Sequence, residues 1–265
     1  MKKLTVFCAA ACLAASAAAQ NHPDLHEVLD RQKGRNLIEI PKGTYTLDVR
    51  NNGPYKFHNL TDVHINGNGS TVICNNQEQA FSFYNCVRVE LRDLTIDYDP
   101  LCFTQGEITA VAEDGSWFDV RIDEGYPVTG LAANRVQFYD PQTRLLKRNS
   151  ITTYTSNYSA LKQLGHNLFR AVKNGTWSAG EQVGDLVVMD VKTDKPNAGV
   201  HTVMLNKCYN TKLENVTVYG SNTFSFFEKE GYANEYRNCV VDRGPMPQGI
   251  RPRLSSGIDD GSHSS

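Results

Sequence analysis

The chain has 265 residues, with 27 Lys and Arg against 29 Asp and Glu, so its formal net charge at pH 7 is −2. A chain so close to neutrality lacks the strong positive field that nucleic-acid binding uses, and we expect no nucleic-acid partner. A membrane-spanning helix needs about 20 consecutive apolar residues, and the longest apolar run is shorter than that. We therefore expect no transmembrane segment.

Residues 1–20 have the organisation of a secretory signal peptide. Lys2 and Lys3 precede an apolar stretch from Leu4 to Ala15, and small residues then lead to a cleavage site near Ala19 and Gln20. A lipoprotein with its lipid on Cys12 is a weaker alternative to a cleaved signal peptide, because no large aliphatic residue stands three positions before Cys12. The sequence predicts a secreted or periplasmic protein. Its mature chain is more acidic than the full chain, because cleavage of the signal peptide removes two lysines.

Four later segments align as copies of one repeat. In each copy apolar and polar residues alternate over a short run, a polar Asn, Asp or Gly interrupts, and further alternating residues follow. The quoted segments begin at Phe57, Phe83, Leu205 and Tyr232, and their matching residues are offset by 26 positions between the first two copies and by about 23 between the last two. Such a period is typical of one coil of a β-solenoid. The sequence predicts an all-β fold, a right-handed parallel β-helix.

One coil cannot bury its own inward side chains, so neighbouring coils must stack. The residues expected to form buried ladders are Val63, Ile65, Val89, Leu91, Leu94, Ile96, Leu213, Val216 and Val218. Asn and Asp tolerate the left-handed conformation of tight corners. The expected corner residues are Asn66, Asn68, Asp93, Asn215 and Asn238.

The mature chain keeps an odd number of cysteines without the spacing of a zinc site or a disulfide framework. Cys86, Cys208 and Cys239 fall at matching or neighbouring places in the repeat, which favours buried, unpaired thiols. Asp97 and Asp99 lack the Gly and Glu spacing of a calcium loop. We expect no metal and no cofactor.

The chain divides into three parts after the leader. Residues 21–102 hold a capping helix, with Leu25, Val28 and Leu29 on one face and Gly34 at its end, followed by the first coils. The offset between the second and third copies is 122, and in residues 103–198 the coil pattern gives way to alternating runs separated by turn signals. That segment predicts an inserted antiparallel sandwich or barrel. Residues 199–265 return to coils and end within the solenoid.

Four segments carry a resemblance to a known family. They are Ile38-Glu-Ile-Pro-Lys-Gly-Thr-Tyr45, Leu94-Thr-Ile-Asp-Tyr-Asp-Pro100, Phe103-Thr-Gln-Gly-Glu-Ile-Thr109 and Gly257-Ile-Asp-Asp-Gly-Ser-His-Ser-Ser265. Together they resemble glycoside hydrolase family 110, the exo-acting α-1,3-galactosidases, and more broadly the pectate-lyase-like β-helix proteins. The resemblance implies a carbohydrate-active enzyme whose acidic catalytic residues lie on successive coils.

The resemblance also places the candidate site residues. A D-G-x-H segment matches Asp260-Gly-Ser-His263, whereas the acidic pair that family members carry one coil later has no counterpart. Glycoside hydrolysis needs two carboxyl groups, and Asp259 and Asp260 would face opposite sides of a strand. We predict Asp260 and Asp259 as catalytic residues. His263, Arg253 and Glu228 are predicted to bind the oligosaccharide or polysaccharide substrate.

Three functions remain open at this point. The first is the N-terminal part of an exo-glycosidase that hydrolyses α-linked galactosides. The second is a polysaccharide lyase of the same fold, which would need a basic cleft. The third is a non-catalytic glycan-binding or surface β-helix protein. An open last coil also predicts end-to-end self-association through its unpaired strand edge.

Overall fold

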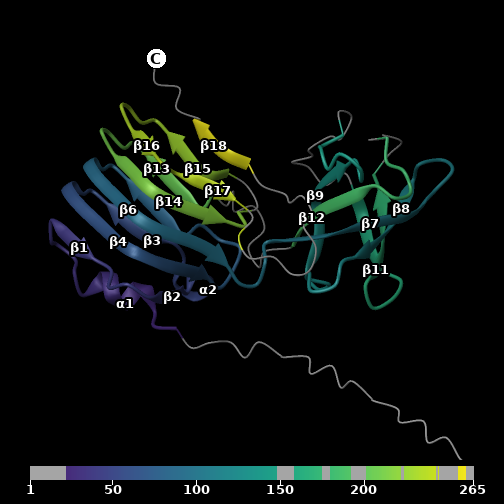
Figure 1. Ribbon diagram of the computed structural model, residues 1–265, viewed down its shortest axis with the longest axis horizontal. Helices are drawn as coiled ribbons and strands as arrows, with labels where there is room; N and C mark the ends of the chain where they lie inside the picture. Colours follow the sequence, from purple (N-terminus) through teal and green to yellow (C-terminus); the bar gives the residue numbers. More distant parts are fainter. Residues whose placement is uncertain are drawn as a thin grey trace, which may run out of the picture.

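A computed structural model describes residues 22–147, 158–174, 180–191, 201–221, 224–242, 244 and 256–260. The predicted signal peptide, Arg253 and His263 lie outside these residues. Within them the strands form three sheets, of seven, five and six strands. Figure 1 shows that the first two sheets stack as one body and the third forms a second lobe beside it. The predicted parallel β-solenoid with an antiparallel insertion is confirmed.

The solenoid consists of the seven-stranded and the five-stranded sheets, and every strand pair in them is parallel. The strands of the seven-stranded sheet are β1 (Leu37–Glu39), β2 (Thr44–Leu47), β4 (Thr61–Cys74), β6 (Val87–Tyr98), β14 (Lys212–Tyr219), β16 (Glu235–Arg237) and β17 (Val240–Asp242). Those of the five-stranded sheet are β3 (Tyr55–His58), β5 (Phe81–Tyr84), β13 (Val203–Asn206), β15 (Phe224–Lys229) and β18 (Ser256–Asp260).

The strand register confirms the repeat. Phe57 lies opposite Phe83, and Phe83 lies opposite Leu205, which reproduces the offsets of 26 and 122 residues. The nine residues predicted to form ladders are at most 5% exposed. They belong to one core cluster that runs from Leu25 in the N-terminal helix to Phe226 in β15. Burial of these columns is the main stabilising term of the solenoid.

Four of the five predicted corner residues adopt the left-handed conformation. Asn68, Asp93, Asn215 and Asn238 have φ between 52° and 56°. Asn215 Nδ2 donates to Asp93 Oδ1 at 2.8 Å, and Asn238 Nδ2 donates to Asn215 Oδ1 at 3.3 Å, so the corner forms a ladder of side-chain hydrogen bonds. The prediction for Asn66 was wrong. That residue does not adopt positive φ, and its Oδ1 instead accepts from the Asn68 backbone N–H at 3.0 Å.

Two further left-handed columns border the corner between the five-stranded and seven-stranded sheets. All of their residues have φ between 52° and 56°: Asn59, Asn85, Lys207 and Glu230 in the first column, and Asp62, Arg88, Asn210 and Ala233 in the second. Asn59 had been interpreted as a corner from the sequence, but the columns as a whole were not predicted, because Lys207, Glu230, Arg88 and Ala233 are of types that rarely adopt this conformation. Stacking on the coils below holds these residues in it.

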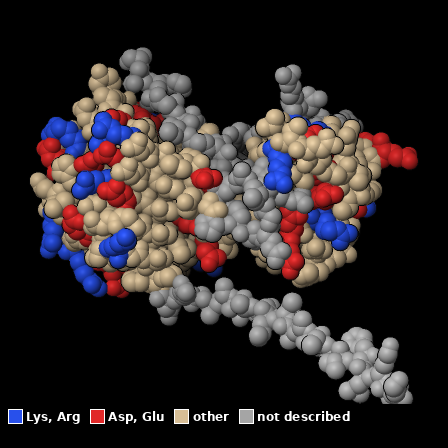
Figure 2. Space-filling view, in the orientation of Figure 1, with Lys and Arg blue, Asp and Glu red and all other residues tan. Residues whose placement is uncertain are grey.

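Charged side chains cover the outer face of the seven-stranded sheet in matched pairs. Glu90 contacts His64 Nδ1 at 2.8 Å and Lys212 Nζ at 3.3 Å, and Lys212 also pairs with Glu214. Arg237 continues the ladder to Glu214 at 3.8 Å. Figure 2 shows basic and acidic groups interleaved on the side of the solenoid that faces away from the second lobe. Exposed pairs of this kind stabilise little individually but keep the face close to neutral.

Helix α1 (Leu25–Asp30) covers the first coil, as predicted. Leu25 and Leu29 are at most 1% exposed, and Val28 packs against the same core. Asp24 caps the helix by accepting from the His26 backbone N–H at 3.0 Å, and the helix ends before Gly34. The other helix in the described ranges is α2 (Val49–Asn52), and neither has the length or apolar character of a membrane span.

The second lobe is inserted between β6 and β13. Its sheet is antiparallel, in the order β10-β11-β8-β7-β12-β9. The strands are β7 (Phe103–Val111), β8 (Trp117–Ile122), β9 (Leu131–Tyr139), β10 (Tyr158–Gln163), β11 (Leu168–Lys173) and β12 (Leu186–Val191). The edge strands β9 and β10 contact each other, so the sheet curls around a separate core that includes Phe118 and Phe138. We call this lobe the insert.

The Asn215 corner gives a test of the solenoid geometry. Asn215→Ala should lower the free energy of unfolding by about 1–2 kcal/mol, because Ala disfavours the left-handed conformation. Asn215→Gly is the matched control, since it removes the same hydrogen bonds but keeps that conformation accessible. Denaturant unfolding measures both. Equal stability of the two variants would show that the corner conformation contributes nothing.

Candidate functional site

The coil has three corners, and one of them carries all the long connections. The two corners already described turn within a few residues. At the third, the chain passes from the seven-stranded to the five-stranded sheet through residues 48–54, 75–80, 99–202 and 220–223. Loops of varied length held on a rigid scaffold are the usual carriers of binding and catalysis. The insert emerges at this corner, which makes its junction with the solenoid the candidate site.

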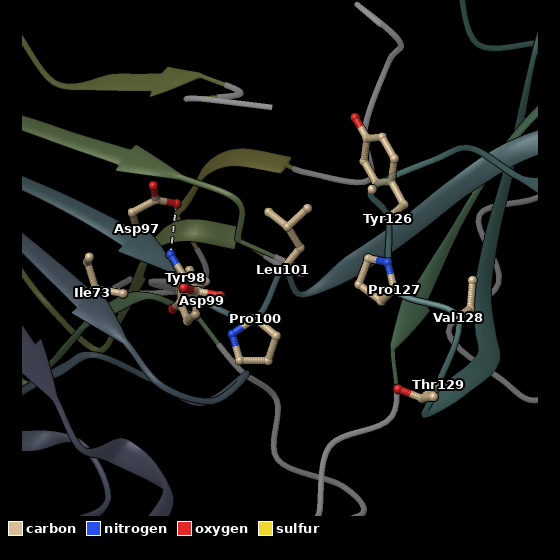
Figure 3. A pocket seen from close by; sticks show the side chains of 11 residues that line it. Ile73, Asp97, Tyr98, Asp99, Pro100, Leu101, Tyr126, Pro127, Val128 and Thr129 are labelled. Carbon is tan, nitrogen blue, oxygen red and sulfur yellow. Dashed lines mark hydrogen bonds between the residues drawn. The ribbon is translucent and has the colours of Figure 1, made fainter. Parts of the chain in front are cut away.

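A pocket of about 600 Å³ lies at this junction. Figure 3 shows its lining side chains, which come from the ends of β4 and β6, the link into the insert and the loop between β8 and β9. We call it the junction pocket; it is lined by Ile73, Asp97, Tyr98, Asp99, Pro100, Leu101, Gly125, Tyr126, Pro127, Val128 and Thr129. Its volume falls in the range of small-molecule sites.

The two sides of the junction pocket differ in chemistry. Two carboxylates, Asp97 and Asp99, belong to the solenoid side, and Tyr126, Pro127 and Val128 belong to the insert side (Figure 3). Asp97 is half-buried, and its Oδ1 accepts from the Tyr98 backbone N–H at 2.8 Å, whereas Asp99 is exposed. The pocket therefore offers charged hydrogen-bond acceptors opposite an apolar wall.

Hydrogen bonds fix both sides of the pocket. The Tyr98 hydroxyl donates to the Glu78 carbonyl at 3.0 Å and is hydrogen-bonded to Thr202 Oγ1 at 3.0 Å. Burial raises the pKa of Tyr98 well above its ordinary value, so this phenol stays neutral. On the insert side, Thr104 Oγ1 donates to the Pro127 carbonyl at 2.7 Å. These contacts give the pocket preformed walls.

The predicted catalytic residues lie at the edge of the five-stranded sheet. In β18, Asp259 pairs with Phe227 and Asp260 pairs with Glu228. The column that ends at position 260 holds buried residues in the other four strands: Phe57, Phe83, Leu205 and Glu228. The column that ends at position 259 holds residues that are not fully buried: Lys56, Ser82, Met204 and Phe227. Position 259 thus belongs to the outward column and position 260 to the inward one.

Glu228, predicted to bind substrate, is a buried member of the inward column. It is 8% exposed, and its carboxylate accepts from Asn234 Nδ2 at 2.6 Å and from the Tyr236 hydroxyl at 3.3 Å. Gly231 stands one coil above Cys208 and leaves the room for this group, because a Cβ there would lie 2.4 Å from Glu228 Oε1. Glu228 thus supports the coil; its contact with substrate stays a prediction.

None of the predicted site residues that fall in the described ranges lines the junction pocket. The sequence analysis weighed Asp97 and Asp99 only as metal ligands, and the described residues contain no metal-binding group of three or more His, Cys, Asp or Glu. A usable signal was their position, immediately before the coil pattern is lost. The opposite wall is the loop from Gly125 to Thr129, and its sequence contains no motif that predicts a binding site.

Neither a protein-family model nor a curated protein matches this sequence. The resemblance to the α-1,3-galactosidases therefore rests on the quoted motifs.

The space at Gly231 can be tested by filling it. Gly231→Ala should destabilise the fold by about 1–3 kcal/mol, the usual cost of overpacking, because the added methyl group meets Glu228, Asn234 and the Cys208 carbonyl. Gly165→Ala is the control, since its nearest contact is 3.6 Å away. Thermal unfolding of both variants measures the difference. A Gly231→Ala protein as stable as the control would mean that Glu228 moves aside freely.

Proposed function

We propose that this protein binds a carbohydrate in the junction pocket. The observation that supports the proposal is the pairing of two carboxylates with an apolar wall in one pocket of about 600 Å³. A sugar presents hydroxyl groups at its edge, which donate to carboxylates, and a C–H face that packs on rings and aliphatic groups. The predicted signal peptide fits a ligand outside the cytoplasm.

We propose hydrolysis of α-linked galactosides as the reaction, in line with the resemblance to glycoside hydrolase family 110. Such hydrolysis uses one carboxyl group to protonate the leaving oxygen and a second to activate water or to attack the sugar. Asp97 and Asp99 supply two carboxyl groups to one pocket. In this proposal they take the roles that the sequence analysis gave to Asp260 and Asp259.

Of the two alternative functions, the polysaccharide lyase is less well supported, and the non-catalytic glycan-binding protein can be tested separately. A polysaccharide lyase would need a basic group to remove a proton, and none of the described residues lining the junction pocket is Lys, Arg or His. A non-catalytic glycan-binding protein would use the same pocket without turnover. Binding and turnover must therefore be measured separately.

The assay is galactose release from a p-nitrophenyl α-galactoside, with binding of free galactose followed by calorimetry. Asp97→Asn and Asp99→Asn should each lower kcat at least about 100-fold, the scale of a lost general acid or base. Asp114→Asn, at an exposed turn of the insert, is the control and should keep full activity.

Other outcomes assign the function differently. Loss of activity in Asp259→Asn and Asp260→Asn, with full activity in the pocket variants, would move catalysis to the edge of the five-stranded sheet. Galactose binding without release by any variant would establish the non-catalytic alternative. Absence of both binding and release would overturn the proposal.

A further inference from the structure

Two cysteines occupy the same position in neighbouring coils. Val87 and Tyr209 form a parallel bridge, and the Tyr209 backbone N–H donates to the Cys86 carbonyl at 2.9 Å, so Cys208 stacks directly on Cys86. Both cysteines are 0% exposed and belong to the solenoid core. The register of the coils therefore places two buried thiols in one column.

The spacing of this column suits a covalent bond between the two sulfur atoms. Neighbouring strands lie about 4.8 Å apart, and disulfides join residues whose Cα atoms are about 4.4–6.8 Å apart. The structure holds Cys86 and Cys208 as free thiols, and these thiols are hydrogen-bonded to each other. The two sulfur atoms are thus already in contact, and a disulfide needs no change in the stacking of the coils.

We propose that Cys86 and Cys208 form a disulfide that links the two coils flanking the insert. The two cysteines are 122 positions apart in the sequence, and the chain between them contains the whole insert. Closing so long a loop costs conformational entropy when the coils stack, and a disulfide reduces that cost by constraining the unfolded chain. Cys74, by contrast, lies between Leu47 and Tyr98 in its column.

The bond forms by exchange with an oxidant that carries a disulfide, such as a thiol oxidoreductase of an oxidising compartment. Cys86 as thiolate attacks one sulfur of the oxidant, which breaks the oxidant's S–S bond and gives a mixed disulfide and one thiolate. Cys208 then attacks the Cys86 sulfur and displaces the second thiolate. Two electrons pass to the oxidant, and the two thiol protons end on its sulfur atoms.

The order of folding and oxidation follows from burial. Both thiols are inaccessible in the folded solenoid, so the oxidant reacts with Cys86 before the coil of β13 and β14 stacks on the coil of β5 and β6. Stacking then brings Cys208 against Cys86. The predicted signal peptide would direct the chain to a compartment in which disulfides form and persist.

Refolding under redox control tests the link. The purified full chain is unfolded and reduced, then refolded with a mixture of reduced and oxidised glutathione, and its remaining thiols are alkylated in denaturant. Mass spectrometry of a digest should find Cys86 joined to Cys208 in most molecules, and in none refolded with reduced glutathione alone. Reduction of the linked protein should lower its midpoint of thermal unfolding by about 10 °C, the scale expected for a long closed loop.

Variants separate this link from other pairings. Cys86→Ser and Cys208→Ser should each abolish the crosslinked peptide and the effect of reductant on thermal unfolding. Cys239→Ser is the matched control and should keep both, because Cys239 is a half-buried thiol that packs against the same core.

The decisive measurements are made on the unmodified chain, so they hold even where a Ser variant fails to fold. Folded protein without the link after refolding with oxidised glutathione would overturn the inference. A link that involves any other cysteine, or a link between two chains, would overturn it as well. An unchanged midpoint of unfolding after reduction would show that the bond does not hold the two coils together, which also contradicts the proposal.

Discussion

The fold depends on one constraint, the in-register stacking of successive coils. Parallel strands lie about 4.8 Å apart, and each inward residue sits directly above its equivalent in the coil before, as Phe83 does above Phe57. A slip of one residue would turn every apolar side chain of a strand outward. Corners within the stack must therefore keep their conformation from coil to coil, even where Lys207 or Ala233 has to adopt positive φ.

The same constraint decides what the sequence could predict. The repeat offsets and the buried ladders could be predicted, because apolar and polar residues alternate along each strand. The corner of Asn68 and Asn215 was visible, because Asn favours the left-handed conformation. The corner columns that contain Arg88 and Glu230 could not be predicted, since stacking on neighbouring coils overrides the backbone preference of Arg and Glu for negative φ. Asn66 was mispredicted because β4 has two more residues at this corner than β6, and the corner falls on Asn68.

The candidate site was less predictable than the fold. The strand register agrees with the expectation that Asp259 and Asp260 lie in columns on opposite sides of the sheet. The junction pocket, however, joins residues up to 56 positions apart in the sequence, from Ile73 to Thr129, across two bodies with separate cores. No periodicity connects them. Only the docking of the loop after β8 against the end of β6 brings them together.

Stacking also explains why the pocket lies at this corner. The two tight corners join their strands within a few residues, so they leave little length of chain for new binding side chains. The connection from β6 to β13 is free of that limit, because both strands are already fixed by pairing with their neighbours. The solenoid then supplies a rigid side through Tyr98, and the insert supplies a wall held by Thr104. The junction pocket thus combines carboxylates from the solenoid side with apolar groups from the insert.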